Sequence, residues 1–117
     1  MSVRLEEKIA QRFAGDPSQK VLWWKGAWES AAETERKTAL CVDSLRRGGF
    51  QQGSRLAAFL PNSPLVHYLS MAAWRLGGTF VPLNPRGGTE WILKILHHTD
   101  PFGVIVDEAM GDLAAAV

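Results

Sequence analysis

The chain has 117 residues, about the length of one domain, with 46% hydrophobic and 21% charged residues. This composition is typical of a globular protein and excludes intrinsic disorder. The 13 basic and 12 acidic residues are spread along the chain and give a net charge of +1. The sequence has no block of basic residues, so a surface for nucleic acid or membranes is not predicted.

A single cysteine, Cys41, excludes an internal disulfide. Because it falls on the apolar face of an expected helix, we interpret it as a small buried side chain, with a reactive thiol as the alternative. The N-terminal residues 1–13 carry charges every few positions and lack the apolar core of a signal peptide. No apolar run approaches the roughly 20 residues of a membrane span, so we expect a soluble cytoplasmic protein.

Residues 3–14 predict a short helix whose apolar side chains recur at every fourth position. These side chains are Leu5, Ile9 and Phe13. A β-hairpin is expected next, because the apolar run that ends at Trp24 is followed by the turn Lys25-Gly26.

Five tryptophans are many for a chain of this length. Burial in the core is the simpler account, and a surface kept for a neighbouring protein is the alternative. They are Trp23, Trp24, Trp28, Trp74 and Trp91.

Ser30 and Glu33 have the spacing of a capping box. The Ser30 hydroxyl is expected to accept from the amide of Glu33, and the Glu33 carboxylate to reach back to the amide of Ser30. The helix that follows ends at Gly48-Gly49, preceded by Arg46-Arg47, which complement the helix dipole. Its predicted buried face consists of Ala31, Thr34, Thr38, Cys41, Val42 and Leu45.

The remainder of the chain alternates strands and helices. Residues 55–60 and 102–106 predict buried strands, and residues 79–81 a short strand. A helix that is apolar on almost every side spans 65–76, and another is capped by Thr89. This alternation predicts an α/β fold class, with right-handed βαβ units in a parallel sheet and helices on both faces.

The turn before the 65–76 helix places Pro64 at its first position, with Ser63 or Asn62 as its cap. A last helix is expected to begin near residue 108.

Few residues are candidates for catalysis or for binding a ligand. Arg86-Gly87-Gly88-Thr89 leads into a helix and could hold an anion, but a plain capped turn is the expected reading. His97 and His98 diverge on a helix and cannot share a metal. His67 is interpreted as a hydrogen-bonded core histidine, with a ligand contact as the alternative. We therefore predict no catalytic and no metal-binding residue, and leave cofactor-binding residues undetermined.

Two turns, taken together with their separation in the sequence, resemble those of a known protein family. Leu60-Pro61-Asn62-Ser63-Pro64 and Val81-Pro82-Leu83-Asn84-Pro85 are together fairly specific, whereas each alone is weak. With the segments Asp16–Val21, Trp28-Glu29 and Trp74–Gly78 in the same order, the chain resembles the N-terminal segment of the AMP-forming acyl-CoA synthetase superfamily. That superfamily includes luciferases and nonribosomal adenylation domains.

The resemblance implies that residues 1–117 form a partial N-terminal α/β subdomain. A helix and a hairpin would occupy residues 1–28, and βαβ units residues 29–117. It also implies a full-length parent that uses ATP, Mg and CoA to activate a carboxylate, as in fatty acid metabolism. The family's catalytic motifs have no counterpart here, so no catalytic residue is carried over and no cofactor is expected on this chain alone. Ser54 stands where the family favours Asp, and Gly87-Gly88 replaces the residues that usually follow Asn84-Pro85-Arg86.

Two hypotheses follow. In the first, the chain is the structural N-terminal portion of an ATP-dependent acyl-CoA synthetase, inactive by itself. Its partner is the remainder of the synthetase or a second copy, bound through exposed apolar surface. In the second, it is a stand-alone non-catalytic α/β binding or interaction module. An independent nucleotide-binding domain is disfavoured because no phosphate loop joins a strand to a helix.

Overall fold

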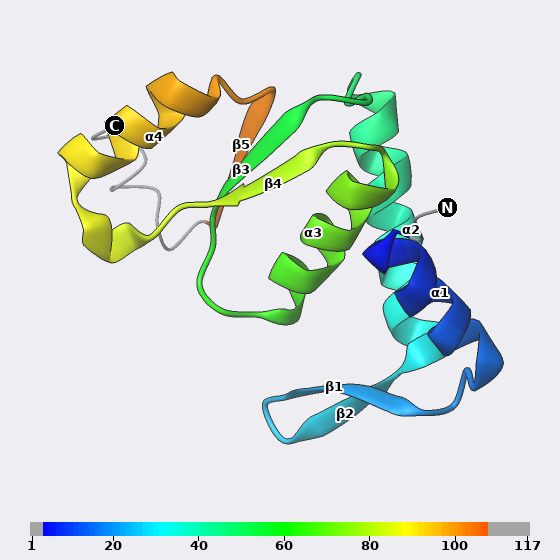
Figure 1. Ribbon diagram of the computed structural model, residues 1–117. Helices are drawn as coiled ribbons and strands as arrows, with labels where there is room; N and C mark the ends of the chain where they lie inside the picture. Colours follow the sequence, from blue (N-terminus) through cyan, green and yellow to red (C-terminus); the bar gives the residue numbers. More distant parts are fainter. Residues whose placement is uncertain (1–3, 108–117) are drawn as a thin grey trace.

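The computed structural model describes residues 4–107. A helix and a hairpin come first, followed by a long helix and then by alternating strands and helices (Figure 1). The elements are α1 (Leu5–Gly15), β1 (Lys20–Trp24), β2 (Ala27–Ser30), α2 (Ala31–Arg47), β3 (Arg55–Phe59), α3 (Pro64–Arg75), β4 (Thr79–Pro82), the 3₁₀ turn η1 (Pro85–Gly87), α4 (Thr89–Thr99) and β5 (Gly103–Val106). The helix expected after residue 107 lies outside the described residues.

The sheet has three parallel strands in the order β4-β3-β5, with Leu56 opposite Phe80 on one side and Gly103 on the other. The chain moves outward from β3 to β4 through α3, and it returns across β3 to β5 through α4. Because both crossovers favour the right-handed form and run in opposite directions, α3 and α4 cover opposite faces. The predicted α/β class, with helices on both faces of a parallel sheet, is confirmed.

Strand β3 divides the core into two clusters, because successive side chains of a strand point to opposite faces. Leu56 belongs to the cluster beneath α2 and α3, whereas Ala57 belongs to the cluster beneath α4. The buried members of the first are Phe50, Leu56, Leu69 and Ala73. Those of the second are Ala57, Phe59, Leu83 and Ile92.

Helix α2 largely follows its prediction. Ala31, Thr34 and Thr38 are buried, and the Ser30 hydroxyl accepts from the amide of Glu33 at 3.2 Å. The second half of the capping box is not formed as expected, because the Glu33 carboxylate accepts from the Arg36 guanidinium at 3.0 Å and 2.5 Å. Cys41 is half-buried and packs against the first core cluster, as expected for a small apolar side chain.

Several expected burials are wrong. Trp23, Trp28 and Trp91 are 59%, 56% and 55% exposed, and Trp24 is also exposed. In α1, Leu5 lies outward and Glu6 is buried instead, because Arg4 pairs with Glu6 and donates to the Trp74 carbonyl of α3. The predicted apolar stripe is therefore kept only in part, since Ile9 and Phe13 are half-buried, and Arg4 adds a polar contact to α3.

Strand β5 was predicted to be buried, but it lies at the sheet edge. Val104 and Val106 are 40% and 39% exposed, whereas Ile105 packs against the first core cluster. Only one face of β5 is therefore covered among residues 4–107.

Gly78 occupies a tight junction between α3 and β4. A Cβ atom at this position would lie 2.4 Å from the Phe50 ring and 2.6 Å from the Ser54 carbonyl oxygen. The junction is closed by hydrogen bonds from the Gly78 amide to Ala73 (2.8 Å) and from the Thr79 amide to Ser54 (2.9 Å). The glycine is therefore required by close packing.

We expect Gly78→Ala to destabilise the chain by about 1–3 kcal/mol, because the added methyl group must displace backbone or an aromatic ring. Urea unfolding followed by circular dichroism measures the change. Gly103→Ala is the matched control, since no atom lies within 4 Å of the added carbon. A Gly78→Ala variant as stable as the control would contradict this account.

Leu56→Ala is expected to cost about 2–5 kcal/mol, because Leu56 is 2% exposed and its removal leaves a cavity in the first core cluster. The same substitution at Leu40, which is 56% exposed on α2, should change stability by less than about 0.5 kcal/mol. Both values follow from the shift in the urea midpoint. Equal effects at the two positions would show that β3 is not the core.

Candidate functional site

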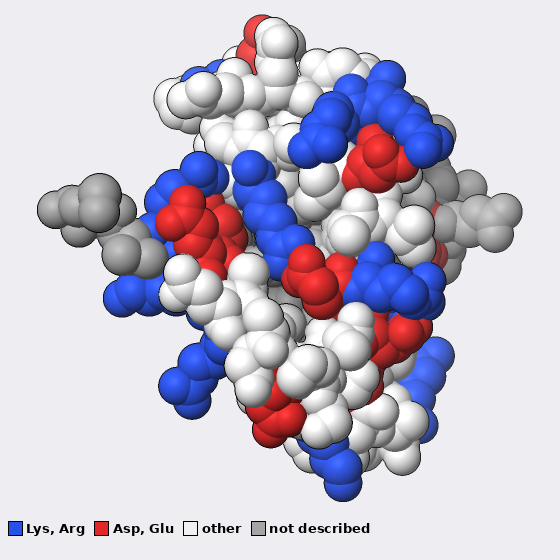
Figure 2. Space-filling view, turned by 90° about the vertical axis from the view of Figure 1, so that its right-hand side faces the viewer, with Lys and Arg blue, Asp and Glu red and all other residues white. Residues whose placement is uncertain are grey.

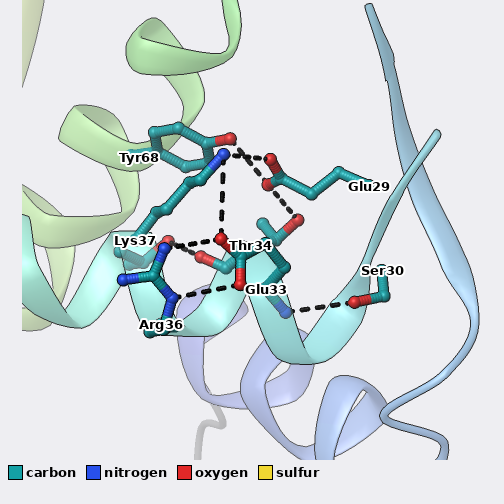
Figure 3. Close-up of polar contacts among 8 residues, drawn as sticks. Glu29, Ser30, Glu33, Thr34, Arg36, Lys37 and Tyr68 are labelled. Carbon is teal, nitrogen blue, oxygen red and sulfur yellow. Dashed lines mark hydrogen bonds and ion pairs between the residues drawn. The ribbon is translucent and has the colours of Figure 1, made fainter. Parts of the chain in front are cut away.

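The carboxylate of Glu29 joins the β1–β2 hairpin to the helices α2 and α3 (Figure 3). Glu29, near the end of β2, accepts hydrogen bonds from the hydroxyls of Thr34 on α2 and Tyr68 on α3, each at 2.6 Å. The Lys37 ammonium of α2 adds an ion pair at 2.7 Å. We call Glu29, Thr34, Lys37 and Tyr68 the Glu29 cluster.

Local structure explains how the cluster assembles. Glu29 lies opposite Leu22 in the hairpin, and the next residue, Ser30, is the N-cap of α2, so Glu29 is held beside the first turns of that helix. Thr34 and Lys37 are three residues apart and therefore share a helix face. Tyr68 reaches them from the second turn of α3, which packs against α2.

The cluster also fixes protonation states. Burial opposes ionisation of Glu29, but hydrogen bonds from Lys37, Thr34 and Tyr68 together outweigh it and lower the pKa of this carboxyl below its ordinary value of 4.5. Burial, with the hydrogen bond to Glu29, raises the pKa of the Tyr68 hydroxyl well above its ordinary value. The cluster therefore holds an ionised carboxylate beside a neutral phenol over the physiological range.

Helical spacing could have indicated that Thr34 and Lys37 share a face. Tyr68 lies 39 residues from Glu29, and no sequence signal joins them before the fold is known. The sequence prediction therefore missed the cluster as a unit.

His67 differs from its prediction. Its Nε2 atom is buried and has no hydrogen-bond partner, and its ring meets Tyr68 edge-on with 6.2 Å between centroids. Burial lowers the pKa of this imidazole, so the neutral form is favoured. The expected hydrogen-bonded core histidine is therefore only half-buried and unsatisfied at Nε2.

The other two histidines, His97 and His98, lie exposed in the last turn of α4. Within residues 4–107 no group of three His, Cys, Asp or Glu side chains is arranged to hold a metal ion.

The glycine-rich turn before α4 is a capped turn, although not through the expected residue. The Asn84 side chain accepts from the Arg86 amide at 3.0 Å and caps η1. Gly88, with φ of 84°, occupies the N-cap position of α4, and Thr89 is already helical. The predicted cap at Thr89 is therefore wrong.

The two turns that carried the resemblance meet at the carboxyl edge of the sheet. The Leu83 amide donates to the Ala58 carbonyl at 2.9 Å, so the second turn continues the pairing with β3. Asn62 and Asn84 line a small cavity of about 310 Å³ between the turns. Pro64 is the first residue of α3 and Ser63 takes the N-cap position, as predicted, without a side-chain capping bond.

The face that carries α1 and α2 has no large patch of one charge. Lysine, arginine, aspartate and glutamate side chains are interspersed on it (Figure 2). Between α2 and α3, Arg75 and Glu35 form a two-pronged pair at 2.7 Å and 2.5 Å. In the part of the chain that the structure describes, no helix is long and apolar enough to cross a membrane.

Comparison with known proteins shows the family to which the chain belongs. The family of AMP-binding enzymes matches residues 9–116, which is nearly the whole chain. The chain therefore belongs to the AMP-binding enzyme family.

Solved structures and a curated relative agree with this assignment. The chain is similar to an inhibitor-bound N-terminal domain of FACL13 from Mycobacterium tuberculosis (TM-score 0.88, 24% identity), covering 95% of this chain and 28% of that one. It is also similar to apo MatB from Rhodopseudomonas palustris (TM-score 0.79, 28% identity), covering 95% and 23%. Nonribosomal peptide synthetase 8 of Aspergillus fumigatus is 26% identical over 95 residues, which are 81% of this chain and 1% of that protein. The chain thus spans about a quarter of these solved structures.

We expect Glu29→Gln to destabilise the chain by about 2 kcal/mol at neutral pH, because charge-assisted hydrogen bonds are lost from three donors. A carboxyl with a lowered pKa contributes stability above its ordinary pKa, and this contribution disappears as the pH falls through the folded-state value. Urea midpoints should therefore fall less steeply below about pH 5 in the variant than in the native chain.

Glu90→Gln provides a control for the loss of one carboxylate, since Glu90 is exposed on α4. It should leave both the midpoint and its acid dependence nearly unchanged. Parallel acid profiles for the native chain and Glu29→Gln would contradict the role assigned to this carboxylate.

Proposed function

We propose that the chain is the structural N-terminal portion of an ATP-dependent acyl-CoA synthetase. The full-length parent would activate a carboxylate as an acyl-adenylate and then transfer the acyl group to CoA, in the cytoplasm. The observation that carries this proposal is that nearly the whole chain matches about a quarter of solved structures of the same fold. Two of these structures bear the names long-chain-fatty-acid CoA ligase and fatty acyl CoA synthetase. Fatty acids are the substrate class that these names favour.

The same proposal divides the chain into two segments. Residues 1–117 would be a partial subdomain, with helix and hairpin in residues 1–28 and βαβ units in residues 29–117. The outer edge of β5 and the exposed side chains of Val104, Val106 and Trp91 would then face the remainder of the synthetase. A parallel sheet is normally covered on both faces, which supports this placement.

ATP, Mg and CoA would be bound by the parent through residues beyond those described. The Glu29 cluster supplies no nucleophile and no phosphate-binding loop. Its carboxylate accepts hydrogen bonds from three donors on α2 and α3, which supports a structural role. The chain alone is therefore proposed to be inactive.

Purified chain 1–117 is expected to catalyse no ATP–pyrophosphate exchange with any of a series of short-, medium- and long-chain carboxylic acids. A complete acyl-CoA synthetase assayed alongside verifies that the exchange is detectable. Acid-dependent exchange by the purified chain would overturn the proposed inactivity.

The exposed tryptophans favour a second candidate, a stand-alone interaction module that pairs with itself or with another protein. An antibody raised against the chain separates the two candidates by the mass of the native protein in its source. A band several times heavier than 12.9 kDa supports the synthetase, and a band at 12.9 kDa supports the module.

A further inference from the structure

The turn of the β1–β2 hairpin carries three of the five tryptophans of the chain, and every residue from 23 to 28 is exposed. We call residues 23–28 the hairpin tip. Trp23, Trp24 and Trp28 are 59%, 41% and 56% exposed. The hairpin lies at the end of the molecule away from the parallel sheet (Figure 1). Clusters of exposed aromatic side chains mark surfaces that contact a protein or a membrane.

The register of the hairpin distributes these rings over both of its faces. Trp23 lies opposite Trp28, so these two side chains share one face. Trp24 follows Trp23 along β1 and lies opposite Ala27, so its side chain belongs to the other face. A flat protein surface covers one face of a two-stranded hairpin, whereas a layer of lipid headgroups can surround a tip on both. An indole ring joins a large apolar body to an N–H donor, which favours the interface between membrane and water.

The charges of the hairpin select the kind of surface. Residues 20–28 include two lysines, Lys20 and Lys25, and no acid. The only acid of the two strands, Glu29, is ion-paired with Lys37 of α2. The hairpin therefore presents positive charge, although the whole chain has a net charge of only +1. Such a tip is attracted to anionic lipids, and it repels the tip of a second copy in a symmetric contact.

Lys25 is placed to contact lipid phosphates. It occupies the turn itself, with φ of 49°, and its Nζ atom lies 5.7 Å from the centre of the Trp24 ring. A lysine beside an aromatic ring can extend its ammonium group to the phosphates while the ring stays among the headgroups. We propose that the hairpin tip binds the surface of membranes that contain anionic lipids, with its three indole rings in the headgroup layer and Lys25 at the phosphates.

The pairing of the hairpin limits how deep it enters. In the part of the chain that the structure describes, β1 and β2 pair only with each other, so their outer edges carry backbone groups outside the ladder. Such groups need water or polar headgroups and are excluded from the hydrocarbon core. The binding is therefore shallow and reversible. It goes beyond the acyl-CoA synthetase assignment and does not depend on it.

Sedimentation with sucrose-loaded vesicles tests the proposal on purified chain 1–117. Vesicles made of equal parts phosphatidylcholine and phosphatidylglycerol should bind the chain at least about tenfold more tightly than vesicles of phosphatidylcholine alone. Added salt should weaken this binding, because it screens the attraction between lysine and lipid. Tryptophan emission should shift to shorter wavelength on binding, as the rings of the hairpin tip leave water.

Matched substitutions place the contact at the hairpin tip. Trp28→Ser should weaken binding to the anionic vesicles by about tenfold, whereas Trp91→Ser, at a tryptophan of nearly equal exposure on α4, should leave it unchanged. Lys25→Gln, at an exposed turn position that needs no repacking, should weaken it by about fivefold. Lys94→Gln, at an exposed lysine of α4, should have little effect. Circular dichroism verifies that each variant is folded.

Equal binding to the two kinds of vesicle, or binding to neither, would overturn the proposal. Equal losses in Trp28→Ser and Trp91→Ser would exclude the hairpin tip as the contact. A dimer that forms without vesicles and that Trp28→Ser abolishes, in a chain that binds no vesicle, would assign the tip to a contact between two copies instead. None of these outcomes changes the expected result of the ATP–pyrophosphate exchange assay.

Discussion

Burial of β3 on both faces is the constraint on which the rest of the fold depends. Leu56 and Ala57 start the two core clusters, and β4 and β5 pair with opposite edges of this strand. Its central residues Ala57 and Ala58 are small and almost fully buried, which allows helices on both sides to approach closely. Every other element of the sheet layer is positioned relative to this strand.

The hairpin is attached by a different kind of interaction. It has little buried apolar surface, since Trp23 and Trp28 lie outside, and a two-stranded hairpin is marginal by itself. The Glu29 cluster therefore carries much of the connection to α2 and α3, through a carboxylate that is 16% exposed. Apolar packing sets the position of the sheet layer, and hydrogen bonds with charge set that of the hairpin.

Local patterns predicted the elements well because helix and strand periods are properties of short segments. The alternation after Gly53, the helix stop at Gly48 and the prolines that bound β3 and α3 are all signals of this kind. Exposure was predicted poorly because it depends on neighbours that a segment does not encode. Trp91, Val104 and Leu5 have apolar side chains of the kind found in protein cores, but all three are exposed. The hydrogen bond between Tyr68 and Glu29 could be found only once the fold was known.

The exposed aromatic residues are not all of one kind, and this difference separates their functions. Trp91 is exposed on α4, and Val104 and Val106 are exposed on β5, which is an edge strand of the parallel sheet. Trp24 and Trp28 instead border a cavity beside the hairpin, which lies away from β5 in Figure 1. Covering the sheet edge would leave the hairpin cavity unchanged, because the two surfaces belong to different layers. A partner could therefore cover the edge of the sheet without contacting the hairpin.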